Sequence, residues 1–209
     1  MIDNMQNAEK NAINKINENY NEIKFQLENA YGSSQFDFLR EEICLCILYG
    51  LNQAAITLTN HFFENFFKTM IQLKLGYDKN NTDLGSMYKD VIDEYDDKNL
   101  ETVLNVCCSS GLITKEQKKT LKELKTKYRN PYSHATKKEI FGEDKLVGFQ
   151  VNPNSTSGES SFSEVKEYET KYNLGVQGLF QELKARKEAK EYFIQLDSII
   201  RETLDKFYK

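Results

Sequence analysis

KEQKKTLKELKTKYRNPYSH, residues 115–134, carries the clearest helix signals in the chain. Thr114 is followed three residues later by Gln117, which is the pattern of a capping box and predicts a helix that begins directly after the threonine. Pro131 has no N–H and disfavours helical geometry at Asn130, so we expect the helix to stop or kink there. Because proline is well accepted in the first turn of a helix, a second helix should follow.

The junction of these two helices carries an arginine and a histidine. Arg129 would close the first helix and His134 would open the second, so both side chains could point at one spot. The arginine fork is permanently charged and matches phosphate oxygens, and histidine both takes and gives a proton near neutral pH. The pair therefore suits phosphodiester chemistry. The plainer alternative is an Asn-Pro turn with a surface arginine and an incidental histidine.

The segment resembles the Arg-polar-x-x-x-His signature of the HEPN superfamily, a family of small helical bundles that includes many prokaryotic ribonucleases. Asn130 fills the polar position after Arg129, and the motif follows a long helix, as that family expects. The general helical layout of most of the chain agrees, but only this hexapeptide is specific. Thr136 stands two positions after His134, where some relatives have a tyrosine, so regulation through such a tyrosine is not expected.

The resemblance implies a metal-independent endoribonuclease with no cofactor. His134 would act as general base or acid and Arg129 would stabilise negative charge, while a ribose 2′-hydroxyl attacks the adjacent phosphorus to leave a 2′,3′-cyclic phosphate. Asn130 and Ser133 would hold or orient this pair, and Tyr132 would pack or contact the substrate. In such nucleases two copies of the motif usually meet at a dimer interface, which implies a homodimer here.

Small single-domain members of this family are typically toxins or phage-defence effectors that act by abortive infection. Control would then come from a separate antitoxin or regulatory protein. Two other classes stay open. The chain could be a catalytically inactive HEPN-like bundle that binds a nucleotide, RNA or a partner protein, or a helical interaction protein in which the motif is simply a turn.

The composition favours one helical domain. The chain has 209 residues, 39% of them hydrophobic and 12% aromatic, which suits a folded core. Two prolines and ten glycines leave few helix breakers. We expect an all-α fold, a HEPN-like up-and-down bundle that spans residues 1–209 as a single domain. Residues 1–31 would form an N-terminal helix or arm, and residues 142–163 a flexible insertion, either a loop or a small hairpin.

The ends and the cysteines bear on location. The N-terminal residues lack the basic and then apolar pattern of a signal peptide, and no apolar run approaches the ~20 residues of a membrane span. The four cysteines form no spacing typical of a metal site, and adjacent cysteines rarely bridge. We therefore expect a cytoplasmic protein with reduced thiols, no membrane partner and no metal.

Apolar periodicity predicts the remaining helices. They cover about 3–30, 36–75 with a bend at Gly50, Asp83 to Tyr95, Leu100 to Gly111, and the chain from Glu164 onward, with a last helix at about 178–208. The acidic residues Asp90, Asp93, Glu94, Asp96 and Asp97 match no calcium loop and are expected to be a solvated face.

A polar line crosses the otherwise apolar segment 36–75. Its members step by three or four residues and are Gln53, Thr57, Asn60, Glu64 and Lys68. A solvated strip is the plainer interpretation. The alternative is that Asn60 and Glu64 face the Arg129–His134 site, where the carboxylate could orient either residue, and HEPN-like proteins often carry a polar or acidic residue on this earlier helix. The other histidine, His61, is not expected to be catalytic.

The charge is unevenly distributed. The chain has a net charge of −4, but the segment from Thr114 to Lys138 contains nine basic and two acidic residues, which gives it a local charge of +7. Along the motif helix, Lys115, Lys118, Lys122, Lys125 and Arg129 step by three or four, so they share one face. Lys118, Lys122 and Lys125 are therefore predicted to bind RNA phosphates leading to the motif, although a solvated lysine face is equally open.

Overall fold

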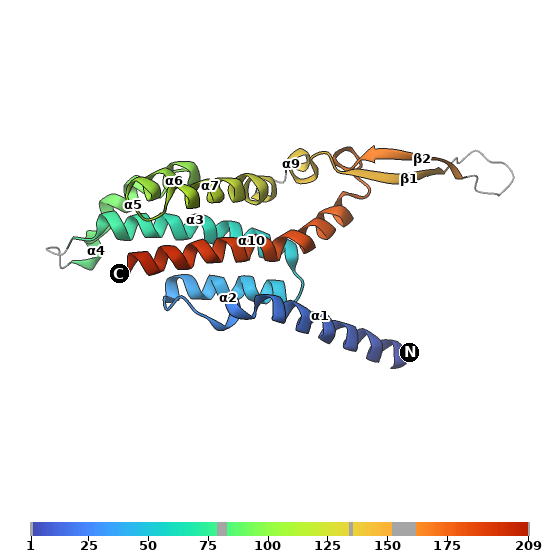
Figure 1. Ribbon diagram of the computed structural model, residues 1–209, viewed down its shortest axis with the longest axis horizontal. Helices are drawn as coiled ribbons and strands as arrows, with labels where there is room; N and C mark the ends of the chain where they lie inside the picture. Colours follow the sequence, from blue (N-terminus) through green and yellow to red (C-terminus); the bar gives the residue numbers. More distant parts are fainter. Residues whose placement is uncertain (1, 79–82, 134–135, 152–161, 209) are drawn as a thin grey trace.

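The computed structural model describes residues 2–78, 83–133, 136–151 and 162–208, and these are mostly helical, with one two-stranded sheet. The long helices lie side by side along the long axis of the molecule (Figure 1). The expected all-α class is therefore confirmed. His134, the predicted catalytic histidine, and the loop 152–161 lie outside the described residues.

The elements follow one another along the chain with short connections. They are α1 (Ile2–Glu28), α2 (Ser34–Leu48), α3 (Asn52–Gly76), α4 (Leu84–Met87), α5 (Lys89–Tyr95), α6 (Leu100–Ser109), α7 (Lys115–Leu124), the π-helical turn η1 (Lys125–Arg129), α8 (Asn130–Ser133), α9 (Lys137–Phe141), β1 (Lys145–Val151), β2 (Phe162–Glu169), the 3-10 turn η2 (Thr170–Tyr172) and α10 (Gln177–Phe207).

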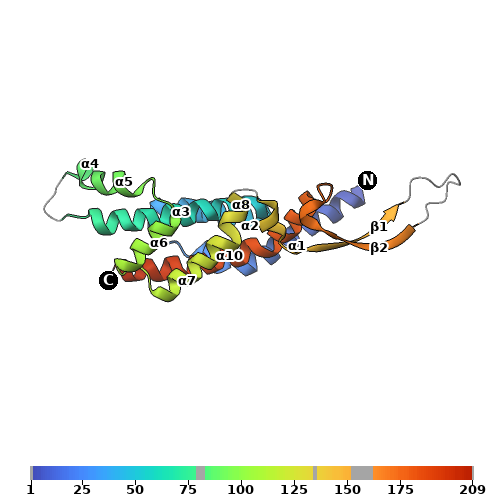
Figure 2. The ribbon, with the colours of Figure 1, turned by 90° about the horizontal axis from the view of Figure 1, so that it is seen from above.

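The helix expected over 36–75 is wrong, because the chain reverses at Gly50. This glycine has a φ of +73°, a left-handed conformation that other residues rarely adopt. The Leu51 N–H donates to the Cys46 carbonyl at 2.7 Å and the Gly50 N–H to the Ile47 carbonyl at 3.0 Å, the paired bonds of a Schellman motif. Helix α2 therefore ends here, and α3 packs back against it (Figures 1 and 2).

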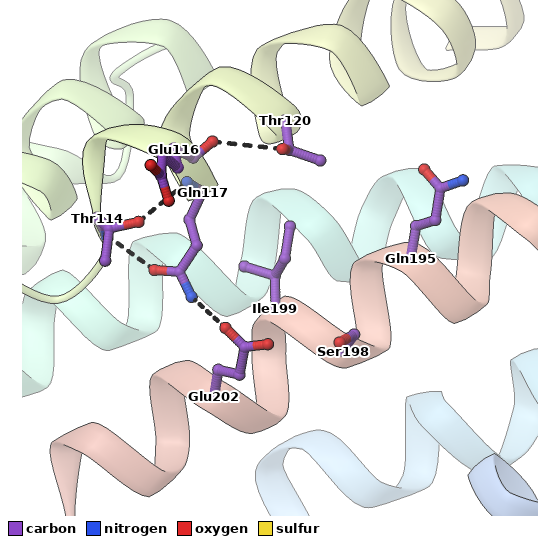
Figure 3. Close-up of a pocket in the computed structure, with 8 residues that line it drawn as sticks. All are labelled: Thr114, Glu116, Gln117, Thr120, Gln195, Ser198, Ile199 and Glu202. Atoms are coloured by element: carbon purple, nitrogen blue, oxygen red, sulfur yellow. Dashed lines mark hydrogen bonds between the residues drawn. The ribbon is translucent and has the colours of Figure 1, made fainter.

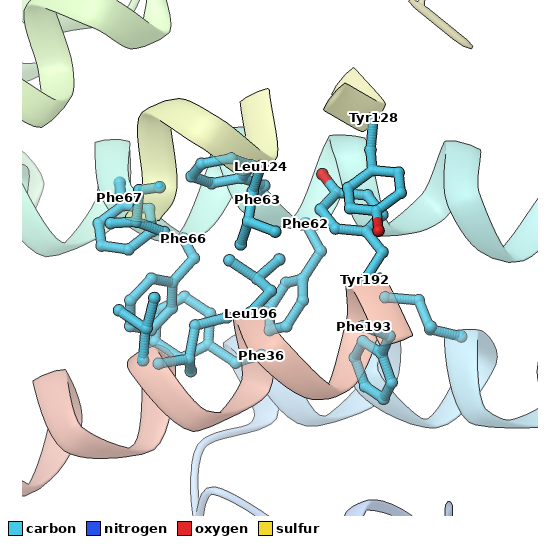
Figure 4. Packing of buried hydrophobic residues seen from close by; sticks show 14 of the residues in the cluster. Phe36, Phe62, Phe63, Phe66, Phe67, Leu124, Tyr128, Tyr192, Phe193 and Leu196 are labelled. Carbon is cyan, nitrogen blue, oxygen red and sulfur yellow. The ribbon is translucent and has the colours of Figure 1, made fainter. Parts of the chain in front are cut away.

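Helix α3 is the centre of the bundle and contacts α2, α5, α6 and α10. Its phenylalanines and Phe36 of α2 are fully buried and fill the space between the helices (Figure 4). The rings of Phe66 and Phe67 meet edge to face with centroids 5.0 Å apart, and those of Phe36 and Phe66 lie 4.9 Å apart. Such aromatic pairs add to the free energy gained from area burial alone.

The motif helix begins as predicted. Thr114 and Gln117 form a complete capping box, in which the Gln117 N–H donates to Thr114 Oγ1 at 3.1 Å and the Thr114 N–H donates to Gln117 Oε1 at 2.8 Å. The Gln117 amide also donates to Glu202 Oε2 of α10 at 2.8 Å (Figure 3). The start of α7 is therefore tied to the last helix.

The segment after the motif differs from the prediction. The helix expected from Glu164 is wrong, because residues 162–169 form strand β2, antiparallel to β1 with Lys145 opposite Glu169. Strand β2 therefore continues past residue 163, the predicted end of the flexible insertion. Phe162, Val165 and Tyr168 are spaced by three, which favours a helix, but the segment pairs with β1 instead. The register of the two strands shifts between Phe149 and Gln150, as at a β-bulge. The hairpin and the N-terminal half of α1 project at the same end of the bundle (Figure 1).

Two further findings concern the thiols and the membrane. The cysteines are free thiols, and burial raises the pKa of Cys44 and of Cys107 to about 12. Among the helices formed by the described residues, none has both the length and the apolar character that a bilayer span requires.

Candidate functional site

The motif helix does not stop at the proline but changes its geometry. After α7, residues 125–129 form the π-helical turn η1, closed by the Asn130 N–H, which donates to the carbonyl of Lys125 five residues back. A π turn is wider than an α turn, and it lies where the ring of Pro131 would otherwise meet the carbonyl four residues earlier. Helix α8 follows with Pro131 in its first turn. The predicted kink near Asn130 is thus this π turn.

Arg129, the last residue of the π turn, is held by a carboxylate of α3. Its Nη2 lies 2.8 Å from Glu64 Oε2, and its Nη1 donates to Asn130 Oδ1 at 3.4 Å. The other oxygen of Glu64 pairs with Lys68 Nζ at 3.2 Å. The side chains of Arg129, Glu64 and Lys68 are only 22%, 28% and 18% exposed, so these ion pairs are partly shielded from water.

Two opposing effects set the ionisation of Glu64. Burial alone would raise the pKa of this carboxyl, but hydrogen bonds and charge from Arg129 and Lys68 outweigh it, and the pKa of Glu64 lies below its usual value. Glu64 is therefore ionised at neutral pH. It fixes the direction of the Arg129 guanidinium, which is one of the roles considered for it in the sequence.

Asn60, one turn before Glu64 on α3, links three helices. Its Nδ2 donates to Ser133 Oγ of α8 at 3.2 Å, and its Oδ1 accepts from the Tyr192 hydroxyl of α10 at 2.8 Å. Asn60 is 5% exposed and Tyr192 is fully buried. The Tyr192 ring stacks on Tyr128 of η1 with centroids 4.5 Å apart and an interplanar angle of 24° (Figure 4). The π turn is therefore packed onto α10 while α8 is hydrogen-bonded to α3.

The polar line on α3 divides into two parts. Asn60 and Glu64 contact the motif segment, as described. Gln53 and Thr57 are exposed, and the Thr57 hydroxyl donates to the Gln53 carbonyl within the same helix. His61 is exposed as well. The solvated-strip interpretation thus holds for the first turns of the line and fails for Asn60 and Glu64.

Tyr132 lies on the side of α8 that faces α10. Its hydroxyl donates to Glu188 Oε2 at 3.3 Å, and its ring packs against the hydrophobic core. Burial raises the pKa of the Tyr132 hydroxyl and also that of the Glu188 carboxyl. Tyr132 therefore anchors the motif segment to α10.

The predicted RNA-binding lysines are partly neutralised. Lys122 Nζ lies 2.5 Å from Glu101 Oε1 and Lys125 Nζ lies 2.9 Å from Glu101 Oε2. Hydrogen bonds from Lys122 and Lys125 hold the pKa of Glu101 at about 2. Lys118 is partly exposed two turns before Lys125 on the same helix. The basic face of the motif helix therefore turns toward α6 at Lys122 and Lys125, where the Glu101 carboxylate bridges two of the three predicted RNA-binding lysines.

An open pocket of about 360 Å³ adjoins Arg129. Its lining comes from α6, η1, α8 and α9 and includes Glu101, Lys125, Arg129, Asn130 and Glu139. The residues that the structure describes contain no group of three or more histidine, cysteine or carboxylate side chains placed to hold a metal ion. The pocket is thus polar, with cations and carboxylates on its walls, and one edge is formed by the motif arginine.

No protein-family model, curated protein or solved structure matches this chain. The resemblance to HEPN proteins therefore stays a prediction from the sequence, made on the hexapeptide 129–134 and the expected helical layout.

The residues of other helices that hold the motif segment could not be recognised in the sequence. Glu101 lies near the start of α6, Tyr192 and Glu188 lie on α10, and none of these residues belongs to a pattern that includes the motif. Glu188 and Tyr192 are four residues apart, so they lie on one face of α10. That spacing indicates that Glu188 and Tyr192 share a face of α10, but it does not indicate that they contact Tyr132 and Asn60.

Proposed function

We propose that this chain is a metal-independent endoribonuclease in which Arg129 and His134 carry out the reaction. The observation that carries the proposal is the placement of Arg129, whose guanidinium is fixed by the ionised Glu64 at the edge of an open polar pocket. An oriented arginine at a solvent-accessible pocket suits the stabilisation of a phosphorane, in which negative charge grows on oxygens that do not leave.

The guanidinium keeps donors for a substrate. Arginine carries five N–H groups, and the bonds to Glu64 and Asn130 use one on each terminal nitrogen. The carboxylate also offsets part of the positive charge, so its contribution is orientation. Fixing a catalytic group before the substrate arrives lowers the entropy cost of the reaction. Glu64 is therefore a positioning residue in this proposal.

In the proposed reaction the ribose 2′-oxygen forms a bond to the adjacent phosphorus, and the bond from phosphorus to the 5′-oxygen of the next nucleotide breaks. A base removes the proton of the 2′-hydroxyl, and an acid protonates the departing 5′-oxygen. His134 serves as one of these groups and Arg129 stabilises the charge on phosphorus oxygens. The products are a 2′,3′-cyclic phosphate and a 5′-hydroxyl, and DNA is spared because it lacks the 2′-hydroxyl.

One histidine does not conveniently serve both faces of the phosphorus at once. We therefore propose that the active form is a homodimer, in which the motif of a second copy supplies the other group. A toxin or antiphage effector under the control of a separate antitoxin or regulatory protein is the biological role that fits such a single-domain ribonuclease.

The test is an RNA-cleavage assay in EDTA with wild type, Arg129→Ala and His134→Ala. We expect a loss of about 10²–10⁴-fold for His134→Ala and about 10²–10³-fold for Arg129→Ala. His61→Ala is the matched control, because it removes the other, exposed histidine and should leave the rate unchanged. Equal cleavage by all four proteins would overturn the proposal.

The second candidate is a catalytically inactive bundle that binds a nucleotide, RNA or a partner protein. The ion pairs favour it, because Arg129, Lys122 and Lys125 all have carboxylate partners within the protein that offset their charge. RNA binding by wild type without cleavage, measured under the same conditions, would support this candidate. Neither binding nor cleavage would support a helical interaction protein in which the motif is a turn.

A further inference from the structure

A second pocket, of about 440 Å³, lies between the base of the hairpin and the first turns of α10. Its lining includes Thr170, Phe180, Leu183, Lys184, Lys187 and Glu188. It shares no lining residue with the pocket beside Arg129. The hairpin base and α10 therefore build a separate concave site.

The buried wall of this pocket contains a hydroxyl group that lacks a partner. Thr170 is fully buried, and its Oγ1 makes no hydrogen bond to any residue that the structure describes. Its backbone is satisfied, because the Thr170 N–H donates to the Asp144 carbonyl at 2.9 Å and its carbonyl accepts from Gln177 Nε2 at 3.4 Å. Buried unsatisfied hydroxyls are rare in folded proteins and call for an explanation. A ligand in the pocket would supply the missing partner if the hydroxyl rotates toward it.

The rest of the lining combines an apolar surface with charges of both signs: Lys145, Lys184 and Lys187 stand beside the carboxylates of Asp144 and Glu188. Phe180 is partly buried and Leu183 is 40% exposed, so both present apolar surface. Lys187 is exposed one turn further along α10, and Lys184 Nζ lies 3.4 Å from Asp144 Oδ2. An aromatic ring on which a base can stack, next to a lysine whose ammonium can bind a phosphate, is the usual composition of a single-stranded nucleic-acid site, and Lys187 is an exposed lysine of this lining.

A continuous set of contacts joins this pocket to the motif. Glu188 lies at the pocket and accepts the hydrogen bond from Tyr132, three residues after Arg129. One helical turn further along α10, Tyr192 is hydrogen-bonded to Asn60, itself one turn from the carboxylate that holds Arg129. Each turn rises about 5.4 Å, so the two sites are separated by roughly 10 Å along the helices, a length that a short stretch of single-stranded RNA covers.

We propose that this pocket is a nucleotide subsite, which seats the base and phosphate of an RNA nucleotide close to the cleaved bond. The inference rests on the proposed ribonuclease function. In it, Phe180 stacks on the base and Lys187 contacts a phosphate. The Thr170 hydroxyl, which is buried in the free protein, turns toward the nucleotide and forms the hydrogen bond that it lacks. The subsite then sets which base is accepted beside the cleavage site.

Two substitutions test the subsite without disturbing the motif. Thr170→Val removes the hydroxyl at nearly constant volume, and because the hydroxyl has no partner to lose, the melting temperature should stay equal or rise. Lys187→Ala removes an exposed charge from the pocket. Arg186→Ala is the matched control, since it is the neighbouring exposed cation on α10 but faces Glu182, with Nη2 3.7 Å from that carboxylate.

The first measurement is cleavage of an RNA of mixed sequence, with kcat and KM determined and the cleaved positions sequenced. We expect Thr170→Val and Lys187→Ala each to raise KM about fivefold to tenfold, the worth of one hydrogen bond or phosphate contact, with kcat unchanged. Both should also flatten the base preference at the cleavage sites, while Arg186→Ala changes neither quantity.

The second measurement needs no cleavage. Calorimetric titration with AMP, CMP, GMP, UMP and inorganic phosphate compares the same proteins. Wild type should bind at least one nucleoside monophosphate more tightly than phosphate, Thr170→Val and Lys187→Ala should weaken that binding about fivefold to tenfold, and Arg129→Ala should not alter it. Binding of free nucleotides with unchanged KM for RNA would assign the pocket to a free nucleotide and overturn the RNA subsite.

The failures of the two proposals are distinguishable. If Arg129→Ala cleaves RNA like wild type, the proposed catalytic role fails whatever the pocket variants do. If Arg129→Ala is inactive but Thr170→Val and Lys187→Ala match wild type in KM, base preference and nucleotide affinity, the catalytic proposal stands and the subsite is refuted. Absence of any nucleotide binding by wild type refutes the subsite as well.

Discussion

The hydrogen bond between Asn60 and Tyr192 offers a quantitative test of how the motif segment is held. In Asn60→Ala, the fully buried Tyr192 hydroxyl loses its acceptor, and Ser133 loses the donor that ties α8 to α3. An unsatisfied buried hydroxyl costs about 1–3 kcal/mol, and Ser133 is exposed enough for water to replace its partner. We therefore expect the free energy of unfolding to fall by about 2–3 kcal/mol.

Substitution of the other partner, and the double variant, isolate the contribution of this hydrogen bond. Tyr192→Phe removes the donor and leaves the Asn60 carbonyl oxygen unpaired, which should cost about 1–2 kcal/mol. The double variant leaves neither group orphaned, so its loss should fall short of the sum of the single losses by about 1–2 kcal/mol. Thr57→Ala, one turn earlier on α3 and exposed, is the control and should change stability by less than about 0.5 kcal/mol.

The assay is urea unfolding followed by far-UV circular dichroism and tyrosine fluorescence, with linear extrapolation to water. Coincidence of the two probes is required, because chains longer than 150 residues do not always unfold in two states. Additivity of the single losses to within about 0.5 kcal/mol would refute the coupling between Asn60 and Tyr192 and, with it, the claim that this bond anchors the motif segment.

Three further predictions concern the carboxylates that hold the motif cations. Glu64→Gln should lower kcat for RNA cleavage about tenfold to a hundredfold with a smaller effect on KM, because Arg129 is no longer oriented; equal kcat values would contradict this. Because the pKa of Glu64 is lowered by folding, its stabilising effect is present above its unfolded pKa of about 4.3 and is lost as pH falls through the lower folded value. The stability difference between wild type and Glu64→Gln, measured by urea unfolding, should therefore be constant from about pH 7 to 5 and shrink below about pH 4; a difference independent of pH would argue against an ionised pair. Glu101→Gln should release Lys122 and Lys125 and tighten RNA binding about threefold in fluorescence anisotropy, since one charge at about 6 Å in water is worth roughly 0.7 kcal/mol. Unchanged affinity would show that these lysines do not contact RNA.

Local features of the fold could be predicted from the sequence, because the interactions that form them are local. The capping box of Thr114 and Gln117 lies within four residues, and Pro131 acts on its immediate neighbours. The helical character of the segment that forms α3 follows from its apolar periodicity. Such features depend on backbone geometry and on which face is apolar, and both are written in adjacent residues.

The reversal at Gly50 could not be predicted in the same way. A glycine within an apolar helical pattern is compatible with a bend in one helix and with a left-handed cap that ends it. The choice depends on whether α3 buries more apolar surface by folding back on α2, which is a property of the whole bundle. For strand β2 the apolar spacing of three favoured a helix, and pairing with β1, more than ten residues earlier, decided otherwise.

The candidate site shows the same division. The chemistry of Arg129 and the link from Glu64 to the motif follow from residue types and helical spacing, so both could be proposed from the sequence. The ion pairs of Lys122 and Lys125 with Glu101 connect the motif helix to α6, and no periodicity in the sequence relates these lysines to Glu101. The stacking of Tyr128 of the π turn on Tyr192 of α10 likewise joins residues far apart in the sequence and is visible only in the assembled bundle.

The most direct test of the central claim is the chemistry of the RNA ends. A short single-stranded RNA is incubated with the wild-type protein in EDTA, and the fragments are analysed by mass spectrometry, alongside Arg129→Ala and a substrate with 2′-deoxyribose at the cleaved position. The proposal predicts a 2′,3′-cyclic phosphate on one fragment and a 5′-hydroxyl on the other, with neither fragment formed by the variant or from the deoxy substrate. Intact RNA with wild type, fragments ending in 3′-hydroxyl and 5′-phosphate, or equal cleavage by Arg129→Ala would contradict it.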